Sequence, residues 1–222
     1  MIRVENIDVW GFDHAVRGMR NPHLSHDKSD SRWEWVEDPS PINPDDPGMT
    51  FVVGENDLDL MRRLYRAGTE HRKYLRQIFC SFDCVAPLYW WKEMDQYKVG
   101  TVTDSCSTMH KIAAKQFVLE DFSVEHLYSD ELEFFKEIVD RLNSAREMYL
   151  DNDIPSRKKC DWWQLIQLLP SSYNQRRTLT MNYENVVSII RQRTGHKLDE
   201  WNAFVEVLKD LPYVKEITED KV

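Results

Sequence analysis

The chain has 222 residues, of which 41% are hydrophobic, 30% charged and only 7 glycine, a composition that excludes a disordered or collagen-like protein. This length predicts a single domain spanning residues 1–222. The formal net charge of −9 argues against a broad nucleic-acid-binding surface. We expect a cytoplasmic protein, because the sequence has no export signal and no apolar run near the roughly 20 residues of a membrane span.

The N-terminal part of the sequence predicts a strand and then a long loop. Apolar residues alternate over 2–9, as in a short strand, with an irregularity at Asn6. A Pro- and Asp-rich loop follows over 27–50, and no regular element is expected in its polar part. Loops of this length are usually functional or mobile, so Trp33 and Trp35 either cover a pocket or pin the loop to the body.

A helix, a strand and a second helix are predicted next. Asn56 or Asp57 can cap a helix that ends near Gly68. Apolar and polar residues alternate over 75–85, which is the period of a strand. Pro87 then opens a short aromatic helix, because proline suits the first helical turn.

The middle of the chain predicts a loop and two helices. Residues 98–107, KVGTVTDSCS, are small, rich in hydroxyls and without periodicity, so we expect a loop. Asp130 and Glu133 form a plausible capping box for a long packing helix. Ser156 can cap a further helix that ends before Pro170.

The C-terminal part predicts a strand and two helices. TLTM, residues 178–181, reads as a short strand. Asn182 then caps a helix that runs to Gly195, and a last helix covers 198–208.

The remaining local signals concern thiols and metals. No Cys-x-x-Cys pair occurs, and thiols stay reduced in a chain without an export signal. No clustered Cys/His set, P-loop or Gly-x-Gly-x-x-Gly motif occurs either, so the sequence supports no metal site. We expect free thiols at Cys80, Cys84, Cys106 and Cys160.

Two stretches, 64–109 and 168–207, resemble the flavin-dependent thymidylate synthases. The first has VAP followed by an aromatic helix and a polar loop, and the second reads LLPSSYNQRRTLTMNYENVVSIIRQRTGHKLDEW. The resemblance covers nearly the whole chain and implies an α/β (α+β) fold with a central mixed sheet and long packing helices. It also implies FAD as cofactor, folate and NADPH as further cofactors, a pyrimidine nucleotide such as dUMP as substrate, and a homotetramer.

The resemblance assigns roles to five residues of the flavin and substrate site. Asn182 falls where the family has a flavin-contacting Asn, and Arg193 where it has the Arg that polarises the uracil ring, so Arg193 is the predicted catalytic residue. His71 stands where the family has a flavin-contacting His. His196 lies one position from a second such His, and Lys197 occupies the aligned position.

The loop that should carry the family's Arg-His-Arg motif departs from it. The corresponding run begins Gln96, Tyr97, Lys98, and only Lys98 and Thr101 keep the charge and hydroxyl types. Two guanidinium forks are thus lost, and a lysine does not reproduce bidentate recognition of phosphate or uracil. A further substrate Arg of the family corresponds to Ile166. The substrate contacts that the resemblance leaves are Gln96, Lys98, Thr101, Asp104 and Ser105.

Several side chains keep two interpretations. A C-terminal basic group could bind phosphate or lie on solvated helix faces, and the Trp90–Trp91 and Trp162–Trp163 pairs could stack on a flavin or belong to the core. Cys106 is an inert thiol unless a His partner activates it. The basic group comprises Arg176, Arg177, Arg191, Arg193, His196 and Lys197.

Three functions follow as hypotheses. The first is a divergent flavin-dependent methylase or hydroxymethylase of a pyrimidine deoxynucleotide, which performs reductive one-carbon transfer. The second is a non-catalytic descendant of the same fold that binds a nucleotide or a protein, carried by a phage-like mobile element. The third is a purely structural oligomeric protein. Fold alone does not choose among them.

Overall fold

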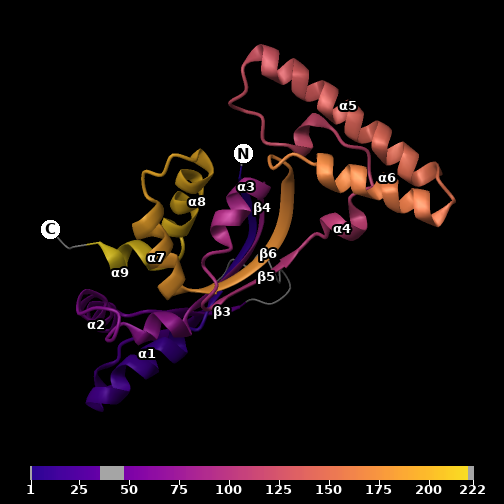
Figure 1. The fold of residues 1–222 in the computed structure, drawn as a ribbon. Helices are drawn as coiled ribbons and strands as arrows, with labels where there is room; N and C mark the ends of the chain where they lie inside the picture. Colours follow the sequence, from indigo (N-terminus) through magenta and orange to yellow (C-terminus); the bar gives the residue numbers. More distant parts are fainter. Residues whose placement is uncertain (1, 36–47, 220–222) are drawn as a thin grey trace. The chain divides into compact units, whose positions relative to one another are not determined.

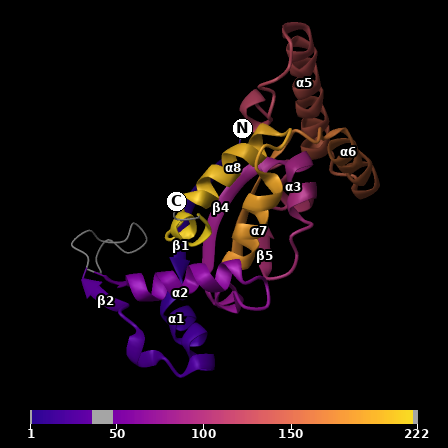
Figure 2. The ribbon, with the colours of Figure 1, turned by 90° about the vertical axis from the view of Figure 1, so that its left-hand side faces the viewer.

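The computed structural model describes residues 2–35 and 48–219 (Figure 1, Figure 2). It combines helices with a four-stranded antiparallel sheet of order β1-β4-β6-β5, so the expected α/β class is confirmed. The strands are β1 Arg3–Trp10, β2 Arg32–Trp35, β3 Met49–Val52, β4 Phe79–Pro87, β5 Thr101–Ser105 and β6 Asn174–Asn182. The α-helices are α1 Phe12–Arg20, α2 Glu55–Arg66, α3 Leu88–Met94, α4 Thr108–Lys111, α5 Ser129–Asp151, α6 Pro155–Leu168, α7 Tyr183–Arg193, α8 Asp199–Lys209 and α9 Val214–Thr218.

The contacts within the chain form two compact units. Among the described residues, unit 1 comprises 2–3, 84–96 and 104–178, and unit 2 comprises 4–35, 48–83, 97–103 and 179–219. The expectation of a single domain stays a prediction. None of the helices in the described part of the chain combines the length and apolar character that a bilayer span requires.

Unit 1 is built on the helix pair α5 and α6, which pack side by side (Figure 1). Phe135, Val139 and Leu142 are buried in its core, on the face that the helical period predicts. The predicted capping box is wrong, because α5 begins at Ser129 without a side-chain cap. Glu133 instead accepts a hydrogen bond from Lys136 at 2.6 Å.

The start of α6 also differs from the prediction. The helix begins at Pro155, one residue before the predicted cap Ser156, because the proline ring already has a helical φ. Asn152 Oδ1 accepts from the backbone N–H of Ile154 at 3.1 Å, which satisfies one donor near the helix start.

The Trp90–Trp91 pair is buried. Both side chains are almost fully buried, and their rings meet edge to face at 4.8 Å. Trp91 Nε1 donates to the backbone oxygen of Gln175 at 3.0 Å. Of the two interpretations of this pair, the structure favours packing.

In unit 2, α2 begins after Gly54, so neither Asn56 nor Asp57 caps it. Asp57 is instead buried and accepts from Arg20 Nε at 2.5 Å. Its other carboxylate oxygen accepts from the hydroxyls of Ser29 at 2.7 Å and Ser31 at 2.6 Å. The carboxylate therefore ties the stretch before β2 to α2, a role that no local pattern indicates.

The predicted loop 27–50 contains regular structure at both of its ends. β2 and β3 pair in antiparallel register, with Trp33 opposite Phe51 and their rings 5.3 Å apart. Aromatic residues favour strands, and cross-strand ring contacts stabilise the pairing. Trp33 also lines a pocket of about 710 Å³. The prolines of the loop lie outside the described residues.

The stretch predicted as a loop over 98–107 contains strand β5. β-branched residues at Thr101, Val102 and Thr103 favour a strand, and β5 ends the strand order of the sheet. The side chains of this edge strand are exposed, so its many hydroxyl groups remain solvated. The strand therefore lacks the alternation of apolar residues by which inner strands are predicted.

The strands predicted from alternation are present. In β4 every second residue from Cys80 to Ala86 is buried, although the strand begins at Phe79 rather than near residue 75. In β1 the expected irregularity at Asn6 is a left-handed residue with φ of 54°. Burial raises the pKa of the Cys80 and Cys84 thiols to about 12. All four cysteines are free.

Helix α7 begins as the sequence predicts. Asn182 is its N-cap, and Asn182 Oδ1 accepts from the backbone N–H of Asn185 at 3.1 Å. Val186, Val187 and Ile189 are buried, and α7 packs beside α8 (Figure 1, Figure 2). Helix α9 is not predicted from the sequence, because its five residues carry too little periodicity.

Candidate functional site

Helix α7 of unit 2 bears two of the predicted residues, Asn182 at its N-cap and Arg193 in its last turn. The segment 97–101 runs beside this helix and is held at both ends. Near the helix start, Asn185 Nδ2 donates to the backbone oxygen of Val99 at 2.6 Å and to Thr101 Oγ1 at 2.9 Å. Near the helix end, Arg193 Nε donates to the Tyr97 hydroxyl at 2.9 Å.

Gly100 allows the segment to approach α7 closely. Its φ is +74°, a left-handed conformation that favours glycine. A Cβ at this position would lie 2.4 Å from Asn182 Nδ2. Two features thus require glycine at position 100: its left-handed backbone conformation and the close approach of the buried Asn182 amide.

Arg193 is half-buried and held by aromatic groups. Its guanidinium carbon lies 4.4 Å from the centroid of the Trp201 ring and 5.6 Å from that of Tyr97. Such stacking favours the charged group and limits its motion. Arg193 Nη1 lies 3.2 Å from His196 Nε2.

His196 faces two donors. The backbone N–H of Leu198 donates to Nδ1 at 3.1 Å, and the guanidinium of Arg193, which can only donate, faces Nε2. The imidazole thus acts as an acceptor for protein groups, and the Arg193 guanidinium supplies the donors at this end of α7. Lys197, beside them in sequence, is exposed. This end of the helix offers donors to an acceptor-rich or anionic group.

Asn182 and Arg193 lie at opposite ends of α7. The helix has 11 residues, which correspond to about 16 Å at the usual rise per residue. One small group cannot contact both side chains, but an extended ligand can. The segment 97–101 joins the two ends, with Lys98 exposed and Thr101 half-buried.

His71 lies away from the donor end of α7. It is exposed and lines a pocket of about 560 Å³ together with Gln77. Its neighbour Arg72 forms an ion pair with Glu184 at 2.7 Å, in the first turn of α7. The structure therefore places His71 on the side of unit 2 that is anchored to the helix start.

The predicted residues of unit 1 are more dispersed. Gln96, Asp104 and Ser105 are exposed, and the two β5 residues do not line the pocket described next. Ile166, aligned with a substrate Arg of the resembled family, packs against the apolar core.

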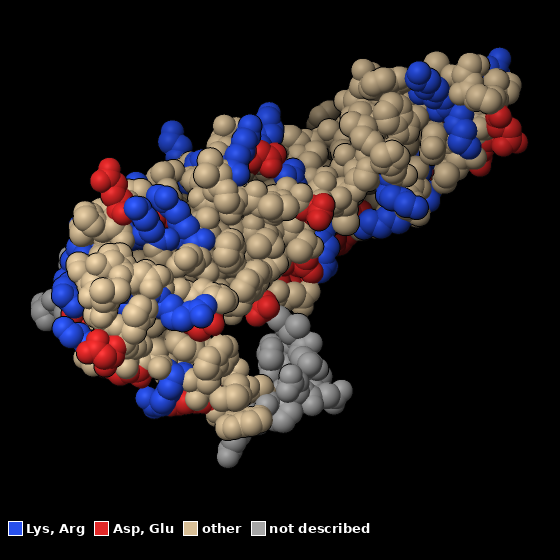
Figure 3. Space-filling view, turned by 90° about the horizontal axis from the view of Figure 1, so that it is seen from below, with Lys and Arg blue, Asp and Glu red and all other residues tan. Residues whose placement is uncertain are grey.

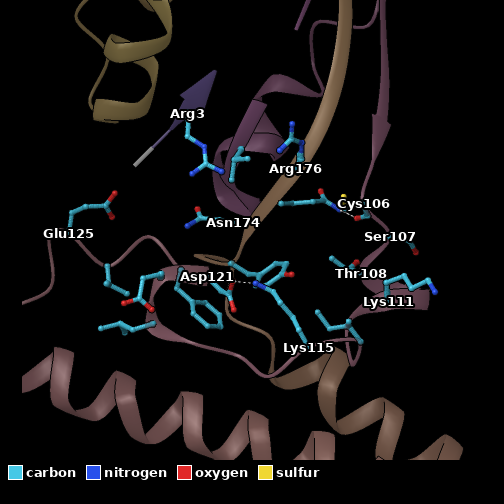
Figure 4. Close-up of a pocket in the computed structure, with 18 residues that line it drawn as sticks. Arg3, Cys106, Ser107, Thr108, Lys111, Lys115, Asp121, Glu125, Asn174 and Arg176 are labelled. Atoms are coloured by element: carbon cyan, nitrogen blue, oxygen red, sulfur yellow. Dashed lines mark hydrogen bonds and ion pairs between the residues drawn. The ribbon is translucent and has the colours of Figure 1, made fainter. Parts of the chain in front are cut away.

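A pocket of about 780 Å³ lies in unit 1, next to the second half of the hydroxyl-rich stretch (Figure 4). Cys106, Ser107 and Thr108 follow one another along its wall, and Lys115 pairs with Asp121 beside it. Its other charged lining residues are Arg3, Lys111, Glu120, Glu125 and Arg176. Cations slightly outnumber carboxylates in this lining, although the chain as a whole is acidic.

The C-terminal basic group is divided between the two units. Arg176 and Arg177 belong to unit 1, and the others belong to unit 2. Arg177 pairs with Asp95 at 2.7 Å and lies over the Trp91 ring at 4.3 Å, which is a structural role. On the face drawn in Figure 3, Lys and Arg stand in separate groups among uncharged residues, some beside Asp or Glu, and form no continuous basic field.

Sequence reasoning missed the residues that organise the donor end of α7. Tyr97 and Trp201 hold the guanidinium of Arg193, and Asn185 holds the segment 97–101. The sequence signal for Tyr97 is its position between Gln96 and Lys98, inside the run that replaces the family's motif. Within the described residues, no group of three or more His, Cys, Asp or Glu is placed to hold a metal ion.

Comparison with known proteins identifies the fold. No family model matches the sequence, and no curated protein matches it. The structure matches a flavin-dependent thymidylate synthase ThyX from Helicobacter pylori complexed with FAD and dUMP, with a TM-score of 0.64 and 16% identity over 98% of each chain. A second Helicobacter pylori ThyX structure with FAD and dUMP matches with a TM-score of 0.63 and 16% identity, over 99% of this chain and 98% of that one.

A third solved structure has a similar arrangement of elements, with a lower TM-score. The UMP/dUMP methylase PolB from Streptomyces cacaoi, bound with 5-Br UMP, has a TM-score of 0.56 and 16% identity over 94% of this chain and 87% of that one. At such identities the likeness concerns the arrangement of the elements. The chain therefore has the fold of the flavin-dependent thymidylate synthases, as the resemblance in its sequence implied.

Proposed function

We propose that this chain is a divergent flavin-dependent enzyme that transfers a one-carbon unit reductively to a pyrimidine deoxynucleotide. One observation carries the proposal. The segment 97–101, which replaces the family's Arg-His-Arg run, contacts the helix that bears Asn182 and Arg193. The two stretches that carry the sequence resemblance thus contact each other within unit 2, through segment 97–101 and helix α7.

The donor set fits a nucleotide or a flavin. Both ligands carry phosphate and ring carbonyl oxygens, and the C-terminal end of α7 presents the donors of the Arg193 guanidinium. Arg193 is already oriented by a hydrogen bond and by stacking, so it needs little reorganisation to stabilise charge on a ring carbonyl. When bound, a reduced flavin would supply hydride and a folate the one-carbon unit.

The roles of the remaining residues follow from their positions. Lys98 can attract a phosphate as a point charge, and Thr101 can donate a hydroxyl hydrogen bond. Asn182, His196 and Lys197 would contact the flavin, with His71 farther along unit 2. In unit 1, Gln96, Asp104 and Ser105 are proposed substrate contacts, on exposed positions. A homotetramer in the cytoplasm belongs to the same proposal.

One observation favours a non-catalytic descendant instead. Ile166 lies in the apolar packing of unit 1, where the resembled family has a substrate Arg. The two Arg residues of the family's motif are also replaced. The nucleotide would therefore meet fewer guanidinium groups that can bind it through two hydrogen bonds. Such a protein would bind a nucleotide without turnover.

Absorbance spectra of the purified protein, with and without added FAD, test the proposal. The expected result is a bound flavin spectrum, a rise in Tm on adding FAD and dUMP, and flavin-dependent turnover of dUMP that Arg193→Ala abolishes. Arg191→Ala is the matched control, because Arg191 is exposed on the same helix. Binding without turnover would favour the non-catalytic descendant. Protein that is colourless and stabilised by neither compound would contradict both.

A further inference from the structure

The Tyr97 hydroxyl lies in the middle of a hydrogen-bond chain that leads to Arg193. Gln192 Nε2 donates to Ser188 Oγ at 3.0 Å. Gln192 Oε1 accepts from the Tyr97 hydroxyl at 3.0 Å, and the same hydroxyl oxygen accepts from Arg193 Nε at 2.9 Å. All four residues belong to unit 2.

The direction of each bond in this chain is determined by the groups themselves. A phenol has a single proton, and Tyr97 gives it to the amide oxygen of Gln192. The lone pairs of the phenol oxygen therefore face Arg193, whose Nε–H can only donate.

Two contacts together orient the guanidinium. The Nε–H bond lies in the guanidinium plane, so the bond to Tyr97 sets the direction of the group within that plane. Stacking on the buried Trp201 ring at 4.4 Å sets the tilt of the plane. Neither contact alone would do both.

We propose that Tyr97 is a positioning residue that holds the Arg193 guanidinium in the orientation in which it meets the pyrimidine ring. This inference rests on the proposed function, in which Arg193 polarises that ring. A side chain already held in place loses less rotamer freedom when a ligand binds, so affinity rises without a new contact to the ligand. The altered motif run thus still serves the site, through Arg193.

The hydrogen-bond chain can be tested without any ligand. We expect the Arg193 Nε–H to give an observable nitrogen–proton NMR signal at neutral pH, assigned by its loss in Arg193→Lys. In Tyr97→Phe the exchange of this proton with water should be at least about tenfold faster, because its acceptor is gone. An exchange rate that Tyr97→Phe leaves unchanged would overturn the hydrogen-bond chain.

The role in binding is tested by calorimetric titration of the FAD-loaded protein with dUMP. We expect Tyr97→Phe to weaken dUMP binding about tenfold. The double variant with Arg193→Lys should bind no more weakly than Arg193→Lys alone, because both changes disturb one unit. Tyr213→Phe is the control. It removes another hydroxyl of unit 2, which accepts from the Val53 N–H at 3.1 Å, and should leave dUMP affinity unchanged.

The outcomes separate this inference from the proposed function. If wild-type protein binds dUMP and Tyr97→Phe binds it equally well, the positioning role is wrong while the function stands. Additive losses in the double variant would also contradict it. If the wild type binds neither FAD nor dUMP, the proposed function fails together with the role of Tyr97 in binding, and the NMR exchange rate alone decides whether the hydrogen-bond chain exists.

Discussion

The ion pair between Arg20 and Asp57 shows how single residues stabilise unit 2. Both side chains are buried, and the second carboxylate oxygen accepts from the hydroxyls of Ser29 and Ser31 and from the backbone N–H groups of Asp30 and Ser31. Burial alone would raise the pKa of Asp57. The hydrogen bonds from the two serines and from Arg20, with the charge of Arg20, outweigh burial and place the pKa below the usual value of 3.8.

We predict that Asp57→Asn lowers the free energy of unfolding by about 3–5 kcal/mol at neutral pH, because Arg20 remains as a buried charge without its carboxylate. Urea unfolding measures this change. The control is Asp59→Asn on the same helix, whose ion pair with Arg63 is largely exposed and should contribute less than about 1 kcal/mol. Equal effects of the two substitutions would contradict the prediction.

The same pair has a defined pH dependence. The folded-state pKa of Asp57 is lower than the unfolded one, so its stabilising contribution is fully present above 3.8 and is lost as the pH falls through the folded value. The difference in stability between the wild type and Asp57→Asn should therefore shrink only in the acid range below 3.8. A difference that shrinks near neutral pH would assign the effect to another group.

Among the elements, the contact between segment 97–101 and α7 depends on Gly100. Gly195 has a similar positive φ, +72° against +74°, but nothing lies within 4 Å of a Cβ added there. We predict that Gly195→Ala costs about 1 kcal/mol for the backbone alone. Gly100→Ala should cost a further 1–3 kcal/mol, roughly, because its Cβ meets the Asn182 amide. Urea unfolding of both variants gives the comparison, and equal costs would show that the segment moves aside freely.

The elements differ in how well the sequence predicts them. The alternation in β4 and the Asn182 cap of α7 are local signals and are confirmed. The sequence predicts loops where strand β5 and the β2–β3 pair lie, because pairing partners rather than local periodicity stabilise these strands. The assigned site roles stay predictions, since a resemblance names residues without placing a ligand.

For the whole molecule, we predict self-association. Large apolar side chains stay exposed on the helix pair of unit 1, among them Phe134 at 63% and Trp163 at 43%. Such exposure is typical of interaction surfaces, and the resemblance in the sequence implies a homotetramer. Light scattering at micromolar concentration should give four times the chain mass of 26.5 kDa. A particle of one chain mass would contradict the tetramer.

By itself the sequence determined the fold resemblance, the free thiols and the elements that have a strong period or a cap. Only the tertiary structure decided that Asp57 meets Arg20, 37 positions away, and that Tyr97 meets Arg193, 96 positions away. The physical reason is that hydrophobic period and capping act between near neighbours along the chain. A hydrogen bond between distant side chains depends on how packed strands and helices bring them together, and no local pattern encodes that approach.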